Sequence, residues 1–158
     1  MKNWILYTFI IGFSAYWASN LLLWFPWSYS SILGITLMLT ISPLLWTYAT
    51  FLTLRTYPNS KLYKGAFIVS IIFLLSAVIM DYIFFGIIRN TMEDLYQPTT
   101  FYGYGFLLAL PFILITAFRN KFQDIKRNLI KSDFSKSILI GFFCFCVLAL
   151  IIILGIKI

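Results

Sequence analysis

The 158-residue sequence has no histidine, two cysteines and only five acidic residues. Without histidine there can be no haem or zinc bound through imidazole and no histidine general base. The sequence also contains no Walker loop, GxSxG or CxxC motif, which removes the usual signatures of phosphate binding, serine hydrolysis and redox exchange. We therefore expect a protein that is not an enzyme and has no catalytic residues, metal ion or cofactor.

The two cysteines, Cys144 and Cys146, lie in an apolar run near the end of the chain. Side chains two residues apart point to nearly opposite sides of an α-helix, so the pair cannot form a disulfide there. Their spacing is not that of metal ligands either. We interpret both as small apolar side chains of a helix.

Charged residues make up 11% of the chain, against about a quarter in globular proteins, while 61% of residues are hydrophobic. Five apolar runs each reach the ~18–20 residues that a helix needs to cross ~30 Å of hydrocarbon. The runs are residues 4–25, 32–54, 65–88, 101–118 and 138–156. We predict an all-α, polytopic integral membrane protein, a single membrane domain over residues 1–158 with five transmembrane helices in a compact bundle.

The lysine and arginine residues are distributed unevenly between the two sides that alternating helices would create. Ten of the twelve fall on one side, and Arg89 and Lys157 fall on the other. An excess of Lys and Arg in short loops marks the cytoplasmic side. We expect residence in the cell membrane, with the N-terminus cytoplasmic and the C-terminus extracytoplasmic.

The segment 119–136, between the fourth and fifth runs, has a helical pattern. Its apolar positions, together with the residue before it, are spaced by four, three and four: Phe118, Phe122, Ile125 and Leu129. Its cations fall largely off that stripe: Lys121, Lys126, Arg127 and Lys131. The pattern predicts a short interfacial amphipathic helix whose cations contact anionic cytoplasmic lipids. The alternative is that this helix docks on a cytoplasmic partner. Juxtamembrane placement explains the net charge of +7 without nucleic acid.

Asp81 is the only acidic residue inside an expected span. It lies about seven residues from the outer end of the third helix, which is ~10 Å deep at ~1.5 Å per residue. A carboxylate at a helix centre costs ~2.5–3.5 kcal/mol on insertion scales, so it normally has a partner or faces a wet cavity. The functional interpretation is a site for a proton, a cation or a polar ligand. The structural alternative is a hydrogen bond to another helix, or a side chain that extends toward the outer surface.

Other polar and aromatic residues are expected at the same outer level. The candidate ligand-binding residues are Asp81, Asn20, Arg89, Tyr102 and Tyr104. Together they could line a shallow pocket between helix ends, where helical bundles commonly bind ligands. The alternative is a solvated loop in which Arg89 pairs with Glu93. We also predict kinks at Pro43 and Pro111, near the middle of two spans, because proline removes a backbone donor from a helix.

Two kinds of function fit these features. The first is a non-enzymatic membrane protein that binds a lipid or small amphiphile at the outer polar group, or a partner membrane protein. The second is a small transporter in which Asp81 takes up a proton or a cation. In both cases the expected partners include membrane lipids, with anionic lipids on the cytoplasmic side.

Overall fold

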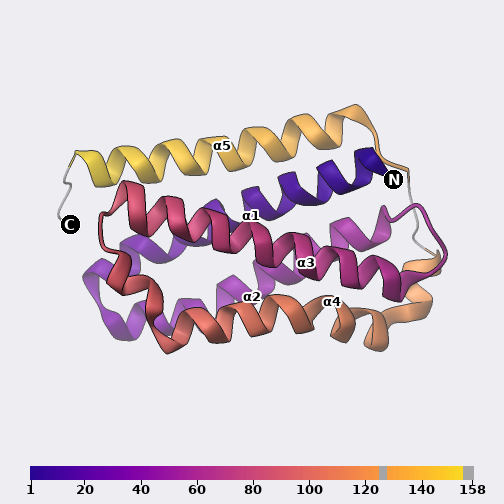
Figure 1. The fold of residues 1–158 in the computed structure, drawn as a ribbon, viewed down its shortest axis with the longest axis horizontal. Coiled ribbons are helices and arrows are strands. Elements are labelled where there is room, and N and C mark those ends of the chain that lie inside the picture. The colour runs from indigo at the N-terminus through magenta and orange to yellow at the C-terminus, as the bar shows by residue number, and fades with distance from the viewer. Residues whose placement is uncertain (125–127, 155–158) are drawn as a thin grey trace.

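The computed structural model describes residues 1–124 and 128–154, without the side chains of residues 24, 25, 27, 28, 123 and 124. Every regular element in these ranges is a helix (Figure 1), which confirms the all-α prediction. The elements are α1 (Lys2–Tyr29), α2 (Ser31–Arg55), α3 (Leu62–Asp81), η1 (Tyr82–Ile88), η2 (Met92–Tyr96), α4 (Pro98–Asp124) and α5 (Lys131–Ile153). Of the two short elements, η1 is a π-helix and η2 a 3-10 helix.

Five helices are long and apolar enough to cross a membrane, as predicted, and they are compatible with membrane residence. Several of the observed helices begin before their apolar runs, because polar residues at the ends continue the same backbone hydrogen bonding. The clearest case is α5, which begins at Lys131, well before its apolar run starts at residue 138.

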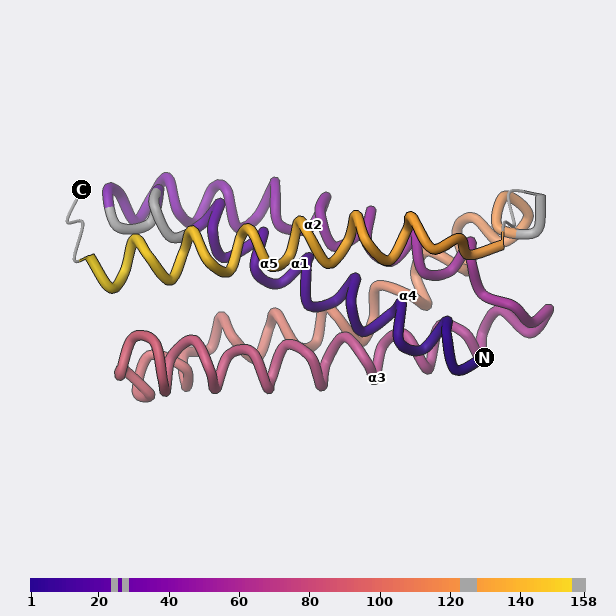
Figure 2. Tube along the Cα trace, turned by 90° about the horizontal axis from the view of Figure 1, so that it is seen from above, coloured from indigo at the N-terminus to yellow at the C-terminus, as the bar shows by residue number. Residues whose placement is uncertain are grey.

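Successive long helices run in opposite directions, so α1 begins and α5 ends at opposite ends of the molecule (Figure 1). One end therefore carries Lys2, Arg55 and Lys131, and we call it the basic end; the other is the Asp81 end. In Figure 2, α2 and α5 lie on one side, α3 and α4 on the other, and α1 crosses between them. Accordingly α1 contacts α2, α3 and α5, while α4 packs against α3 and α2.

Because α1 is central, it is more buried than the outer helices. Half of the residues in its most apolar stretch are buried, against 17% in that of α5. The ring of Trp17 packs edge-on against Phe145 of α5 and Phe84 of η1, at 4.7 and 6.2 Å between centroids. Near the start of α1, the indole N–H of Trp4 donates to the carbonyl of Thr53 at 2.9 Å. Aromatic edge contacts of this kind contribute ~0.5–1.5 kcal/mol each beyond buried area.

Large apolar side chains face outward on the peripheral helices. On α5, Leu139 and Phe143 are 68% and 64% exposed, and on α4 Ile113 is 57% exposed. Soluble monomers rarely leave large contiguous apolar surfaces open to water. Such a surface suits contact with lipid.

The predicted interfacial helix between the fourth and fifth spans is not present in the described part of that segment, residues 119–124 and 128–136. Residues as far as Asp124 belong to α4, and α5 already begins at Lys131. No interfacial helix separate from α4 and α5 is therefore evident in these residues. Ile125, Lys126 and Arg127, on which it also depended, lie outside the described residues.

The reason lies in a break and a contact within α4. Phe118 has φ −129° and ψ 27°, outside the helical range, and the helix resumes beyond it in a new direction. Phe122 is then 1% exposed, and its ring lies 5.4 Å from that of Phe51 in α2. The apolar stripe thus includes a side chain that packs against another helix of the same chain.

Pro43 lies inside α2 and Pro111 inside α4, where the kinks were predicted. The break in dihedral angles along α4 is at Phe118, one to two turns after Pro111. Kinks at the prolines themselves stay a prediction.

Candidate functional site

Asp81, the last residue of α3, is 8% exposed, and its carboxylate binds two tyrosines from other helices. The hydroxyl of Tyr16 in α1 donates to Oδ1 at 2.5 Å, and that of Tyr104 in α4 donates to Oδ2 at 2.6 Å. A single carboxylate therefore joins α1, α3 and α4 at this level. Hydrogen bonds to an ionised acceptor are short and strong, in keeping with these distances.

Of the two partners, Tyr104 belongs to the predicted ligand group, whereas Tyr16 was not predicted. Tyr16 is only 5% exposed and precedes Asn20 by four residues on the same face of α1. That spacing was the available signal, because residues four apart lie one above the other on a helix. The side-chain amide of Asn20 donates to the backbone carbonyl of Tyr16, one helical turn earlier, at 3.0 Å.

A cavity of about 220 Å³ lies beside this carboxylate. Its polar lining comes from α1, α2, α3 and α4: Tyr16, Ser19, Asn20, Ser42, Asp81, Thr99, Thr100 and Tyr104. Its aromatic lining is Trp46, Phe85 and Phe106. Gly103 also lines the cavity, and a Cβ added there would meet no atom within 4 Å. The space in front of Gly103 is thus open.

Ser19 links this cavity to a second one. The second cavity, also about 220 Å³, lies between α1 and α2 and is lined almost entirely by apolar side chains, among them Leu22, Leu37 and Ile41. Both cavities are lined by Ser19, Leu23 and Ser42. The hydroxyl of Ser19 is buried and has no hydrogen-bond partner within the described ranges, so it is available to a ligand or a water molecule.

The remaining predicted ligand residues, Arg89 and Tyr102, do not line the Asp81 cavity. Arg89 forms an ion pair with Asp94 at 3.1 Å, where the sequence suggested Glu93, and its guanidinium lies 5.3 Å from the ring centre of Phe85. The helical spacing fails because regular helix ends before this pair. Tyr102 is 77% exposed.

The helix changes form immediately after Asp81. η1 is a π-helix, and at its end the N–H of Arg89 donates to the carbonyl of Phe84 at 2.9 Å, five residues back. Asn90 then adopts φ 53°, the left-handed region that asparagine tolerates. Single π turns inside α-helices frequently occur at functional sites.

The predicted membrane-surface cations lie at the other end of the molecule. Lys121 and Lys131 are exposed at the basic end. Lys126 and Arg127 fall outside the described residues.

No protein-family model, curated protein or solved structure matches this chain. The chemistry of the residues around Asp81 is therefore the basis for any assignment. That chemistry is a carboxylate with two hydroxyl donors, further hydroxyl and amide groups, and aromatic faces. Groups of three or more potential metal ligands do not occur in the described part of the chain. The arrangement suits the binding of a monovalent cation, an ammonium group or a proton.

Proposed function

We propose that this protein binds a small amphiphile with an ammonium head, without catalysing a reaction. The observation that carries the proposal is the Asp81 carboxylate, held by Tyr16 and Tyr104 beside a cavity that adjoins an apolar one. The ammonium head would lie at Asp81 and the apolar tail in the second cavity.

Charge supports an ammonium head. The two tyrosine hydroxyls donate to the carboxylate and offset part of the cost of burying its charge. The described lining of the cavity contains no lysine or arginine that would neutralise it. A cation would complete the site, and the aromatic ring of Trp46 lies in the same lining.

Size supports an amphiphile that occupies both cavities. Each cavity, at about 220 Å³, is smaller than the ~300–1,000 Å³ of a typical ligand pocket. The first has polar, aromatic and aliphatic lining residues and contains the carboxylate, whereas the second is lined mainly by leucine and isoleucine. This division matches the two halves of one amphiphilic molecule.

The proposal includes insertion in the cell membrane as a compact helical bundle, with the basic end cytoplasmic. The excess of lysine and arginine at that end follows the positive-inside rule. On this orientation the Asp81 cavity lies in the extracytoplasmic half of the bundle. A reporter fused to the C-terminus should be active outside the cytoplasm, and activity inside would contradict the orientation.

The test compares two ligands that differ only in the head. Dodecylamine and dodecanol would be titrated into nanodiscs containing the protein, and binding would be followed by tryptophan fluorescence. We expect the amine to bind at least about tenfold more tightly, because a hydrogen bond to a charged group contributes ~1.5–3 kcal/mol. Asp81→Asn should reduce the amine-to-alcohol ratio to near one.

Two further variants make the result specific. Asp94→Asn removes an acid from the same end that does not line the cavity, and it should leave the ratio unchanged. Gly103→Leu places a side chain in the open space and should weaken binding of the amine by about tenfold or more, as an order-of-magnitude expectation for steric exclusion. Equal binding of amine and alcohol by the unaltered protein would contradict the proposal.

Transport of a proton or cation by Asp81 is the second candidate function. The observation that favours it is a row of cavities along α1 and α2. A third cavity, of about 390 Å³, lies toward the basic end and shares Leu45 with the second. In proteoliposomes, a pH-dependent flux that Asp81→Asn abolishes while ligand binding persists would establish transport, and absence of any flux would dismiss it.

A further inference from the structure

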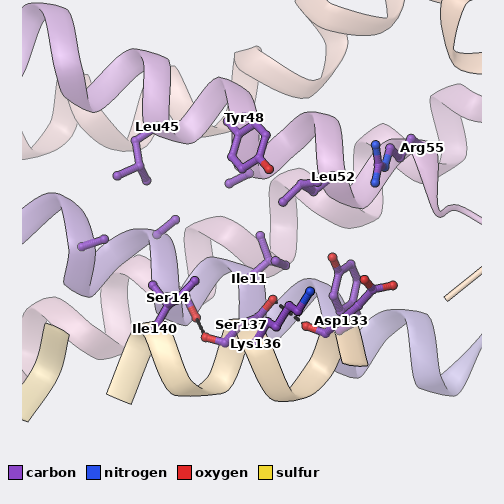
Figure 3. Close-up of a pocket in the computed structure, with 14 residues that line it drawn as sticks. Ile11, Ser14, Leu45, Tyr48, Leu52, Arg55, Asp133, Lys136, Ser137 and Ile140 are labelled. Atoms are coloured by element: carbon purple, nitrogen blue, oxygen red, sulfur yellow. Dashed lines mark hydrogen bonds between the residues drawn. The ribbon is translucent and has the colours of Figure 1, made fainter. Parts of the chain in front are cut away.

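A cavity of about 390 Å³ lies at the basic end, away from Asp81. It is bounded by α1, α2 and α5, and Figure 3 shows its α2 wall facing α5. Small side chains of α1 and α2 form its floor: Ser14, Ala15, Ala18 and Ala49. Larger apolar side chains form its walls, among them Ile11, Leu45, Leu52 and Ile140. The cavity falls within the ~300–1,000 Å³ of typical ligand sites.

The cavity is elongated along α2. Its lining on that helix extends from Leu45 to Arg55, which at ~1.5 Å per residue is ~15 Å. This is half of a ~30 Å hydrocarbon core, or the depth of one leaflet. In a membrane, one end of the cavity would therefore lie at the surface and the other near the midplane. The length of the cavity thus matches that of an acyl chain in one leaflet.

Two cationic side chains line the surface end of this cavity. Arg55 on α2 and Lys136 on α5 both line the cavity, and Figure 3 shows them toward the same end of it. The Nε of Arg55 is buried and has no hydrogen-bond partner in the part of the chain that the structure describes. A buried N–H of this kind requires an acceptor.

Asp133 also lines this end, but its carboxylate already has a structural role. It accepts a hydrogen bond from the backbone N–H of Ile130 at 3.2 Å and so caps the first turn of α5. With one acid and two cations, the surface end of the cavity keeps a net positive charge.

From these features we propose that the cavity binds an anionic phospholipid of the leaflet at the basic end. One acyl chain would lie between α2 and α5 on the floor of α1, and the phosphate would accept hydrogen bonds from Arg55 and Lys136. The site is separate from Asp81 and does not depend on the proposed amphiphile function.

Native mass spectrometry of the detergent-purified full chain would test this, with phosphatidylglycerol and phosphatidylcholine of identical acyl chains added separately. We expect one bound phosphatidylglycerol at concentrations where phosphatidylcholine is not retained. Each cation near an anionic surface contributes ~1 kcal/mol, or about fivefold in affinity. Arg55→Gln with Lys136→Gln should therefore reduce the preference about 25-fold.

Matched variants separate this site from general surface charge. Lys61→Gln with Lys121→Gln removes two exposed cations of the same end that do not line the cavity, and it should leave the preference unchanged. Ala18→Leu should weaken retention of phosphatidylglycerol by filling the floor. If the double variant does not fold, Lys136→Gln alone, at an exposed position, should still reduce the preference about fivefold.

Four results would overturn the proposal. The first is equal retention of the two lipids by the unaltered protein. The second is an equal loss of preference in the Lys61 and Lys121 control. The third is a lipid-free dimer, which would assign the cavity to a second copy of the chain. Glycerol 3-phosphate should not displace the lipid; displacement, the fourth result, would show that the site recognises phosphate alone.

Discussion

The two ends of this protein differ in how their charged side chains are exposed to the surroundings. At the Asp81 end, one carboxylate is 8% exposed, and both of its oxygens accept hydrogen bonds from tyrosines of other helices. At the basic end, lysines such as Lys61 and Lys131 are exposed. A buried carboxylate is very costly unless it has hydrogen-bond partners, whereas an exposed ammonium group is satisfied by water or lipid headgroups.

The difference extends to how the helices are joined. At the Asp81 end, polar contacts connect α1, α3 and α4. Along the α1–α5 interface, close packing does this: Ser14 donates to the carbonyl of Ser137 at 2.6 Å, and Gly141 lies directly against α1. The polar end is therefore specified by hydrogen bonds to one carboxylate, and the α1–α5 contact by one hydrogen bond together with close packing at Gly141. Substitutions should therefore act through different mechanisms in the two regions.

The largest effect is expected at Asp81. Asp81→Ala removes the shared acceptor of Tyr16 and Tyr104, and a buried donor without a partner costs ~1–3 kcal/mol. We expect the free energy of unfolding to fall by about 2–4 kcal/mol, measured by denaturant titration in detergent. Asp94→Ala removes only a half-exposed ion pair with Arg89 and should change it by less than about 1 kcal/mol. Equal losses would erase the distinction between buried and exposed charge.

Removing one donor at a time should have a smaller effect. Tyr16→Phe deletes a hydroxyl that donates to Asp81 from a buried position and should lower stability by ~1.5–3 kcal/mol. Tyr104→Phe should cost less, because Tyr104 lines the cavity and is partly exposed. A double-mutant cycle with Asp81→Asn measures the coupling. Additive losses would show that the hydroxyls act independently of the carboxylate.

Two glycines test how much close helix packing contributes to stability. A Cβ at Gly141 would lie 2.5 Å from Oγ and 2.9 Å from Cα of Ser14, so Gly141→Ala should force α1 and α5 apart and lower stability by ~1–3 kcal/mol. A Cβ at Gly103 meets no atom within 4 Å. Gly103→Ala should leave stability unchanged or raise it by up to ~1 kcal/mol through helix propensity. Thermal unfolding monitored by circular dichroism would rank the two variants.

The smallest effect is expected at Tyr57, in the loop between α2 and α3. Its ring packs on Trp4 at 4.7 Å, and its buried hydroxyl has no hydrogen-bond partner within the described residues. Burial raises the pKa of Tyr57 above its ordinary value, so folding favours the neutral phenol. This contribution is present below about pH 10 and falls as the pH rises through the folded pKa.

Tyr57→Phe should accordingly leave the free energy of unfolding near neutral pH within about 1 kcal/mol of the original, because no hydrogen bond to the hydroxyl is lost. The variant should also retain more stability above about pH 10 than the unaltered protein. Unfolding measured at pH 7 and at pH 11 would show this. A loss at pH 7 alone would indicate that the hydroxyl has a partner.

Hydropathy and charge predicted the features that depend on local composition. Apolar length is a property of consecutive residues, so the five helices could be identified without any tertiary contact. The unusual position of Asp81 was equally evident, since a carboxylate inside an apolar run is rare. Asn20 and Tyr104 line the same cavity as Asp81, because alternation of helix direction sets depth, and their role in ligand binding stays a prediction.

The sequence was less informative wherever two helices must be known together. Tyr16 and Asp81 are 65 residues apart, and only the oblique course of α1 brings them into contact. The apolar stripe around Phe122 predicted a lipid-facing helix, but helical periodicity does not distinguish lipid from the side of α2. The apolar length of five helices and the uneven distribution of charge were thus determined by the sequence alone. The tyrosine partners of Asp81 and the cavities along α1 were decided only by the tertiary structure, because both depend on how side chains from different helices meet.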